Sequence, residues 1–282
     1  MTEPAGEAPE GEQRLSKVLK ALTQVTSYVA FTTALLYYFG WRRSEAQAHA
    51  FGADASIFGM SSEDYVLRSI DVVLIPLLIL LLAGLGAVWL HGKLVGSRYV
   101  GLAARVLGFS WLVCVVGAVL LLLVAPDAGK LSVPFWFAGG LLGTWYATSL
   151  HRTVSGGRAP TSLPVLVLLA TLTAASMFWM TERVARVVGE ARAEQIKADV
   201  GGTLEEVGVY SAKRLQLQAD GVEESALTDA DAAYRYRYDH LFLLQESGDK
   251  FFLLTGDWSP GRGQLVVLPD DGSIRLVFGP GR

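Results

Sequence analysis

The chain has one cysteine and four histidines in 282 residues. Because Cys114 is alone, no intrachain disulfide can form, and packing must hold the fold together. The histidines, at positions 49, 91, 151 and 240, lack the spacing of metal ligands, and no serine or cysteine stands in a familiar nucleophile motif. These absences predict a non-enzymatic protein with no metal and no cofactor.

Charge is missing from five long apolar stretches in the first 180 residues. Each stretch has 18 to 20 residues, which as a helix matches a hydrocarbon core of about 30 Å. The absence of ionisable residues within them argues against an ion-coupled transporter. We therefore expect a membrane α-helical bundle of five transmembrane helices, at residues 21–40, 72–90, 106–125, 133–150 and 163–180.

The charges that are present divide unevenly along the chain. Residues 1–180 carry twelve Lys/Arg and ten Asp/Glu, a net of +2, whereas residues 181–282 carry twelve and seventeen, a net of −5. An acidic C-terminal part argues against binding to nucleic acid, whose phosphates require a basic surface. The segments 1–20, 91–105 and 151–162, which would share one side of the membrane, carry eight Lys/Arg. The segments 41–71 and 126–132, on the other side, carry four. The positive-inside rule then predicts a multipass plasma-membrane protein with a cytoplasmic N-terminus and an extracytoplasmic C-terminal domain.

The chain divides into four parts by composition. Residues 1–13 are acidic, contain Pro and Gly, and lack large apolar side chains, so we expect a disordered tail. Residues 14–180 form the five-span domain. Residues 181–200 are charged but keep apolar residues at helical spacing, which predicts a helical stalk that continues the fifth span. Residues 201–282, which begin with two glycines, form the last part.

Short strand-like segments fill this last part. They show alternating apolar residues and are separated by turn residues, which predicts a small, mainly antiparallel β domain or half-barrel that could pack on the stalk. Pro269–Gly272 has the composition of a tight hairpin turn between the last two strands. The expected strands are 206–211, 214–218, 234–245, 250–255, 264–268 and 273–278.

Tyrosines alternate with arginines at the start of the third of these strands. Because alternate residues of a strand point to opposite faces, Tyr234, Tyr236 and Tyr238 share one face and Arg235 and Arg237 the other. Arg235, Tyr236 and Arg237 are candidate ligand-binding residues for a glycan or an anionic envelope polymer. The alternative is a core of tyrosines with solvated arginines on the far side.

The loop at residues 41–71 is the most distinctive part of the membrane half. Residues 42–51 are expected to form a short amphipathic helix that ends at Gly52, and apolar side chains of the loop, such as Phe51 and Phe58, to dip into the membrane interface. Arg68 and Asp71, three residues apart, are a candidate ion pair, although such exposed pairs usually have no further role.

Two features concern packing between helices. Gly139, Gly143 and Ala147 are spaced by four residues, as are Ser110, Cys114 and Ala118, which predicts close helix contact within the chain, or a homo-oligomer seam. The first apolar stretch is the most polar. We expect it to pack inside the bundle through interhelical hydrogen bonds or, alternatively, to line a water path; its polar residues include Thr23, Gln24, Ser27 and Tyr28.

The loop pattern F-G-A-D-x-S-x-F-G-M-S-x-x-D-Y-x-L-R-S and the later segments VYSAKRL and YRYRYDHLFLL resemble segments of actinobacterial multipass membrane proteins of unknown function. The resemblance implies membrane placement and no catalytic activity. The resulting hypothesis is a membrane protein whose outward β domain binds, senses or scaffolds at the cell envelope, with the lipid bilayer and an envelope component as partners. The alternative is a homo-oligomeric channel or small-solute transporter that uses the polar first span.

Overall fold

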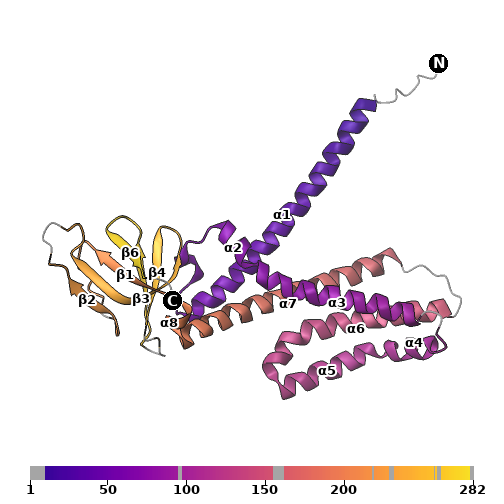
Figure 1. Ribbon diagram of the computed structural model, residues 1–282. Coiled ribbons are helices and arrows are strands. Elements are labelled where there is room, and N and C mark those ends of the chain that lie inside the picture. The colour runs from indigo at the N-terminus through magenta and orange to yellow at the C-terminus, as the bar shows by residue number, and fades with distance from the viewer. Residues whose placement is uncertain are drawn as a thin grey trace.

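The computed structural model places a set of helices at one end of the molecule and an antiparallel sheet at the other (Figure 1). It describes residues 10–94, 97–154, 162–217, 219–228, 232–256, 258 and 262–279. Most of the expected disordered tail, residues 1–9, lies outside these ranges. The helices are α1 (Glu10–Ala50), the 3-10 helix η1 (Ala55–Phe58), α2 (Ser62–Arg68), α3 (Ile70–Leu94), α4 (Val100–Gly108), α5 (Ser110–Val124), α6 (Pro126–Val154), α7 (Leu163–Ala198) and α8 (Val200–Thr203).

The prediction of five membrane spans is wrong. Within the described residues, only two helical segments are long and apolar enough to cross a membrane, α2 with α3 (Ser62–Leu94) and α7 (Leu163–Ala198). A third is obtained if α4 and α5, bent by 48° at their junction, count as one span. Thr, Gln, Ser and Tyr make α1 too polar for this class, and Gly, Thr, Ser and aromatic residues do the same for α6.

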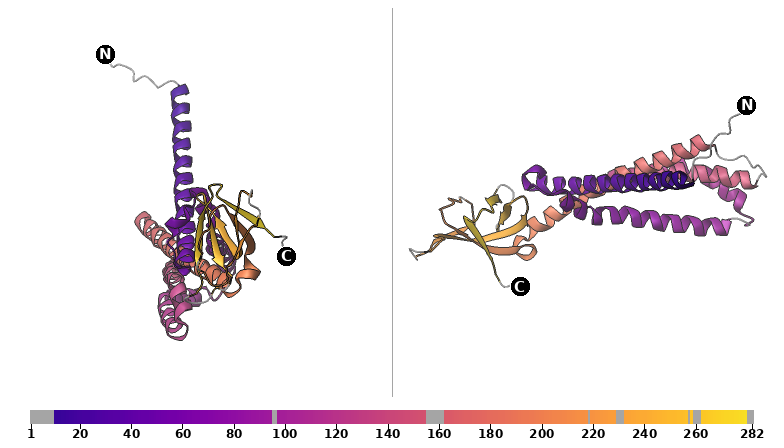
Figure 2. Two further views of the ribbon diagram at one scale, coloured as in Figure 1. Left: turned by 90° about the vertical axis from the view of Figure 1, so that its left-hand side faces the viewer. Right: turned by 90° about the horizontal axis from the view of Figure 1, so that it is seen from above.

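Helix α1 differs most from the expectation. It continues past the first apolar stretch to Ala50, so the separate helix expected at residues 42–51 is its last part, and Gly52 ends it at a φ of +74°. From Leu35 onward, α1 packs on α7 and α3. The residues before Leu35 project away from the other helices instead of packing inside a bundle (Figure 1; Figure 2).

The two runs of small residues pack against each other, as the spacing predicts. A Cβ on Gly143 would lie 2.6 Å from Ser110 Oγ, and one on Gly140 would lie 3.3 Å from the Cβ of Cys114. Ser110 also donates a 3.3 Å hydrogen bond to the carbonyl of Gly140. The small residues of α6 therefore let the backbones of α5 and α6 approach closely.

The sheet has the strand order β5-β4-β3-β1-β6. Strands β2 and β4 both pair with the same edge of β3, β2 along its first half and β4 along its second half. All pairs are antiparallel, so the expected small antiparallel β unit is present. The strands are β1 (Glu205–Ser211), β2 (Glu223–Ala226), β3 (Tyr236–Glu246), β4 (Lys250–Thr255), β5 (Leu265–Pro269) and β6 (Ile274–Phe278).

The expected hairpin at Pro269–Gly272 does not form, because β5 and β6 lie at opposite edges of the sheet. Five residue steps join Pro269 to Ile274 and span at most about 18 Å. The turn within them, where Asp271 accepts a 3.0 Å hydrogen bond from the Ser273 amide, shortens that reach. Four strand spacings of a flat sheet need about 19 Å, so the sheet must curl until its edges approach (Figure 2).

Five of the six expected strands are confirmed, and Lys250–Thr255 matches β4 at both ends. The prediction of a strand at 214–218 is wrong, because residues 214–217 form no strand. Strand β2, with sequence EESA, was missed because all four residues are exposed and carry no apolar alternation. A bulge at Asp239 and His240, with a φ of +62° at His240, places Leu241 in the same buried cluster as Tyr238 three residues earlier, whereas Phe242 belongs to a different cluster.

Candidate functional site

Helices α1 and α7 touch backbone to backbone beside the sheet. A Cβ on Gly189 of α7 would lie 2.3 Å from the carbonyl oxygen of Arg43 and 3.0 Å from the Cβ of Ala46. Only a glycine permits this approach. The contact lies beyond the apolar part of α7, where the helix carries charges on its exposed side and buries Val184, Ala185 and Ala193 on the other.

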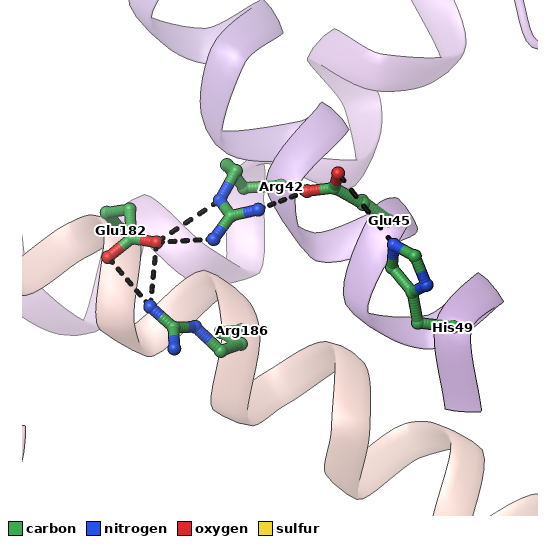
Figure 3. Close-up of polar contacts among 5 residues, drawn as sticks. All are labelled: Arg42, Glu45, His49, Glu182 and Arg186. Carbon is green, nitrogen blue, oxygen red and sulfur yellow. Dashed lines mark hydrogen bonds and ion pairs between the residues drawn. The ribbon is translucent and has the colours of Figure 1, made fainter. Parts of the chain in front are cut away.

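A network of charged side chains spans this contact (Figure 3). Arg42 donates from Nε (3.1 Å) and Nη2 (2.8 Å) to Oε1 of Glu182. Arg186 Nη2 donates to the same oxygen at 3.0 Å. Arg42 also pairs with Glu45, whose carboxylate lies 3.9 Å from His49 Nε2. Two guanidinium groups therefore balance two carboxylates, and the two helices are joined by a charge-compensated network.

The network shifts the pKa of Glu182 and of Arg42 in favour of the charged forms. Burial raises the pKa of Glu182, but the hydrogen bonds from Arg42 and Arg186 outweigh burial, and the net pKa is lowered. The pKa of Arg42 is raised, mainly by its hydrogen bond to Glu182. Both groups are thus ionised at neutral pH, and the pair fastens α1 to α7.

An open cleft of about 410 Å³ lies beside the network. Most of its polar lining consists of paired groups, which suits a structural contact between the two helices. In the described part of the chain, no group of three or more His, Cys, Asp or Glu side chains is placed to hold a metal ion. The lining residues are Arg42, Glu45, Ala46, His49, Ala50, Arg186 and Glu190.

The predicted pair of Arg68 and Asp71 is divided between other partners. Arg43 Nη1 lies 2.9 Å from Oδ1 of Asp71 and donates at 2.9 Å to the carbonyl of Arg68. The guanidinium of Arg68 instead reaches the sheet, where Nη2 donates to Oε1 of Gln245 at 2.7 Å. Arg68 therefore links the end of α2 to β3, a contact between residues 177 positions apart that no local pattern could reveal.

The loop after α1 completes the core of the sheet rather than entering a membrane. The rings of Phe58 and Phe252 are 4.6 Å apart, and those of Phe51 and Trp258 are 5.5 Å apart in a T-shaped contact. Phe51 and Phe58 are only 6% and 4% exposed. Asp54 caps η1 by accepting a hydrogen bond from the Ser56 amide at 2.8 Å, which fixes the loop in this position.

Two glycines mark the point of closest approach between the loop and the sheet. A Cβ on Gly248, in the turn between β3 and β4, would lie 3.1 Å from the carbonyl oxygen of Gly59. Both residues have positive φ, +59° for Gly59 and +58° for Gly248. Each glycine is recognisable in the sequence as a turn residue, but the contact between the two is not.

The candidate ligand-binding strand is more neutral than its sequence suggests. Arg237 is exposed but pairs with Asp239 at 2.8 Å and lies over the ring of Tyr210. Arg235 is exposed and Tyr236 is half-buried. Tyr238 is fully buried, and its hydroxyl accepts a 2.8 Å hydrogen bond from the amide of Leu215. The structure therefore supports the interpretation in which the tyrosine face belongs to the core.

Comparison with known proteins adds no function to these sites. No protein-family model, curated protein or solved structure matches this chain. The similarity of its loop and strand segments to actinobacterial membrane proteins therefore stays a prediction, and the function has to be argued from the geometry of the junction between helices and sheet.

Proposed function

We propose that the protein is a membrane-anchored, non-enzymatic module that holds its β sheet at a fixed position beside the membrane, where the sheet binds, senses or scaffolds at the cell envelope. The observation that carries the proposal is the junction. Helix α7 runs without a break from its apolar half (163–180) into the charged half that contacts the sheet, and the loop after α1 fills the core of the same sheet.

This arrangement supports a rigid connection. The sheet is attached through α7 and α8 on one side, where Ile196 and Val200 pack against Phe242. It is attached a second time through Phe58 and through the hydrogen bond from Arg68 to Gln245. A flexible tether would need neither the second attachment nor the capped loop that provides it. A force applied to the sheet, or a ligand bound there, would therefore act directly on the positions of α1, α3 and α7.

The charges favour an orientation with the sheet outside. The start of α3 and the end of the apolar part of α7 both lie at the sheet end of the molecule (Figure 1). At the opposite end, the described residues of 91–105 and 151–162 include four Lys/Arg and no acidic residue. By the positive-inside rule this opposite end would face the cytoplasm.

Two observations bear on the partner and on the rival function. The pairing of Arg237 with Asp239, and of Arg214 with Glu224 at 2.6 Å, neutralises cations that an anionic envelope polymer would need. The polar residues in the first half of α1 are exposed and pack on no other described helix, and the hydroxyls of Thr23 and Ser27 bond to carbonyls of their own helix. Neither set of contacts favours a channel along α1.

Cysteine labelling in intact cells tests the placement. In a Cys114→Ser background, a membrane-impermeant maleimide should label Arg275→Cys, which is exposed on β6, without permeabilisation. It should label Lys93→Cys, at the far end of α3, only after permeabilisation. Labelling of both sites in intact cells, or the reverse pattern, would contradict the orientation.

Photocrosslinking tests the binding role. A photoreactive residue at Arg275 or Val277 on the sheet should give the same discrete crosslinked product in intact cells. The matched control is the same residue at Leu85, which is 68% exposed on α3 and lies away from the sheet end. Products that do not differ between the sheet and Leu85 would contradict a specific role for the sheet.

A further inference from the structure

Arg68, the last residue of α2, has a guanidinium group without a counter-ion. Its side chain is half-buried, and only one of its nitrogens, Nη2, has a protein acceptor, the neutral amide oxygen of Gln245 at 2.7 Å. Within the described residues, no carboxylate lies within ion-pair distance of this guanidinium. A cation that is partly withdrawn from water is normally paired with an anion, because the unpaired charge is costly to bury.

The acidic residues closest to Arg68 in the sequence are engaged by other groups. Asp64, one turn earlier, accepts hydrogen bonds of 2.9 Å from both the amide and the hydroxyl of Ser61. Asp71 pairs with Arg43, whose guanidinium also donates to the carbonyl of Arg68. The two guanidinium groups therefore have one carboxylate in contact between them, which leaves an excess of positive charge at this point of the junction.

Two buried N–H groups beside this charge also have no acceptor among the described residues. They are Nε of Arg43 and Nε2 of Gln245, which belongs to the same amide whose oxygen accepts from Arg68. Buried donors are nearly always paired, and an unpaired one points to a water or an ion nearby. Donors therefore outnumber acceptors here. An anion against the accessible part of Arg68 would supply the missing negative charge without displacing the buried groups.

The position of Arg68 indicates which anion can reach it. It lies two residues before Ile70, where α3 begins, at the sheet end of the molecule (Figure 1). Ile70 and Leu74 lie on one side of α3 and are 57% and 58% exposed, and the apolar helix continues beyond them. In the membrane placement proposed above, these apolar side chains lie in the hydrocarbon and Arg68 lies at the level of the lipid phosphates.

We propose that the guanidinium of Arg68 binds a phosphate group at the junction between helices and sheet, either the phosphate of a phospholipid headgroup or that of a small soluble ligand. A guanidinium holds two phosphate oxygens along one edge by charge-assisted hydrogen bonds. The contact with Gln245 already orders the side chain, so less conformational entropy is lost on binding. The site itself does not depend on the proposed anchoring; only a phospholipid as the source of the phosphate does.

Thermal unfolding of the delipidated chain in a non-ionic detergent measures the binding, because a ligand of the native state raises the unfolding temperature as its concentration increases. Dioleoyl phosphatidylglycerol is compared with dioleoylglycerol, which has the same acyl chains and no phosphate. Sodium phosphate is compared with sodium chloride at equal ionic strength. Stabilisation by phosphatidylglycerol alone indicates a lipid headgroup, and stabilisation by sodium phosphate, with or without the lipid, indicates a site open to soluble phosphates. Either result supports the proposal if it depends on Arg68.

Three variants test that dependence. Arg68→Gln should raise the dissociation constant of the stabilising probe about tenfold to a hundredfold, the effect of losing a hydrogen bond to a charged group. Gln245→Ala removes the same structural hydrogen bond but keeps the guanidinium, and it should bind as the wild type does. Arg275→Gln removes one charge from an exposed position on β6 and should also leave the binding unchanged.

Equal stabilisation by the phosphate-containing and the phosphate-free probes would overturn the proposal, even if Arg68→Gln did not fold. Binding that Arg68→Gln leaves unchanged would do the same. An equal loss in Gln245→Ala would assign Arg68 a structural role only, and an equal loss in Arg275→Gln would show a general attraction between charges. These measurements use purified protein in detergent, so their failure would leave the cysteine-labelling test of the membrane placement unaffected.

Discussion

Gly189 offers the sharpest test of the junction, because its backbone contact with α1 leaves no room for a side chain. The substitution Gly189→Ala adds one methyl group, which would sit 2.3 Å from the carbonyl oxygen of Arg43. The neighbouring atom is backbone, so it cannot rotate away, and α1 and α7 must separate. The change is small enough that the chain should still fold.

The size of the effect is best obtained against a matched control. Gly86 of α3 is also helical, and a Cβ there would meet nothing within 4 Å. Both alanines gain the same helix propensity, about 1 kcal/mol, so the difference between the two variants isolates the clash. Overpacking of this kind lowers the free energy of unfolding by about 1–3 kcal/mol.

Thermal unfolding in detergent or nanodiscs measures this difference. Gly86→Ala should unfold at the same temperature as the wild type or slightly above it. Gly189→Ala should unfold lower than Gly86→Ala by on the order of 5 °C. If the two variants shift equally, the two helices do not touch at Gly189, and the account of the junction fails.

Three further predictions concern other residues of the junction and of the helix contacts. Gly143→Leu should lower the free energy of unfolding by about 1–3 kcal/mol because of Ser110, and an unchanged melting temperature would place that face toward lipid. Phe58→Ala should lower the free energy of unfolding by about 3 kcal/mol and make the sheet more sensitive to proteolysis. Ile57→Ala, a change at the neighbouring exposed residue, should have neither effect. The lowered pKa of Glu182 contributes to the free energy of unfolding at neutral pH, and this contribution is lost as the pH falls through that pKa. The Glu182→Gln variant should therefore be less stable than the wild type at neutral pH and should lose less stability on acidification. Parallel profiles of stability against pH for the two proteins would contradict the role of the network.

Local patterns in the sequence predicted the features that depend on neighbouring residues. Alternation and turn residues predicted five of the strands, including Lys250–Thr255 at both ends. Four-residue spacing of small side chains predicted the contact of α5 with α6 at Gly143. The capping box of α2 likewise joins two residues that are close in the chain, Ser61 and Asp64. In each case the determining residues are close in the chain.

The main errors concern the placement of segments in the tertiary structure. Apolar length alone suggested five spans, but polar residues in α1 and glycines in α6 remove those helices from the set that meets the membrane criteria. Phe51 and Phe58 were apolar residues in a loop, and only the tertiary fold shows that they fill the core of a sheet more than 140 positions later in the chain. The same holds for the division of Arg68 and Asp71 between Gln245 and Arg43.

Distance measurements between spin labels test the central claim, a sheet held rigidly on membrane-anchored helices. In the Cys114→Ser chain in nanodiscs, labels at Arg275→Cys on β6 and Glu63→Cys on α2 occupy exposed positions on the two sides of the junction. A single narrow distance distribution, broadened by Phe58→Ala but not by Ile57→Ala, is the predicted result. A distribution that is already broad in the Cys114→Ser chain with Phe58 intact would show that the sheet moves freely and would contradict the account.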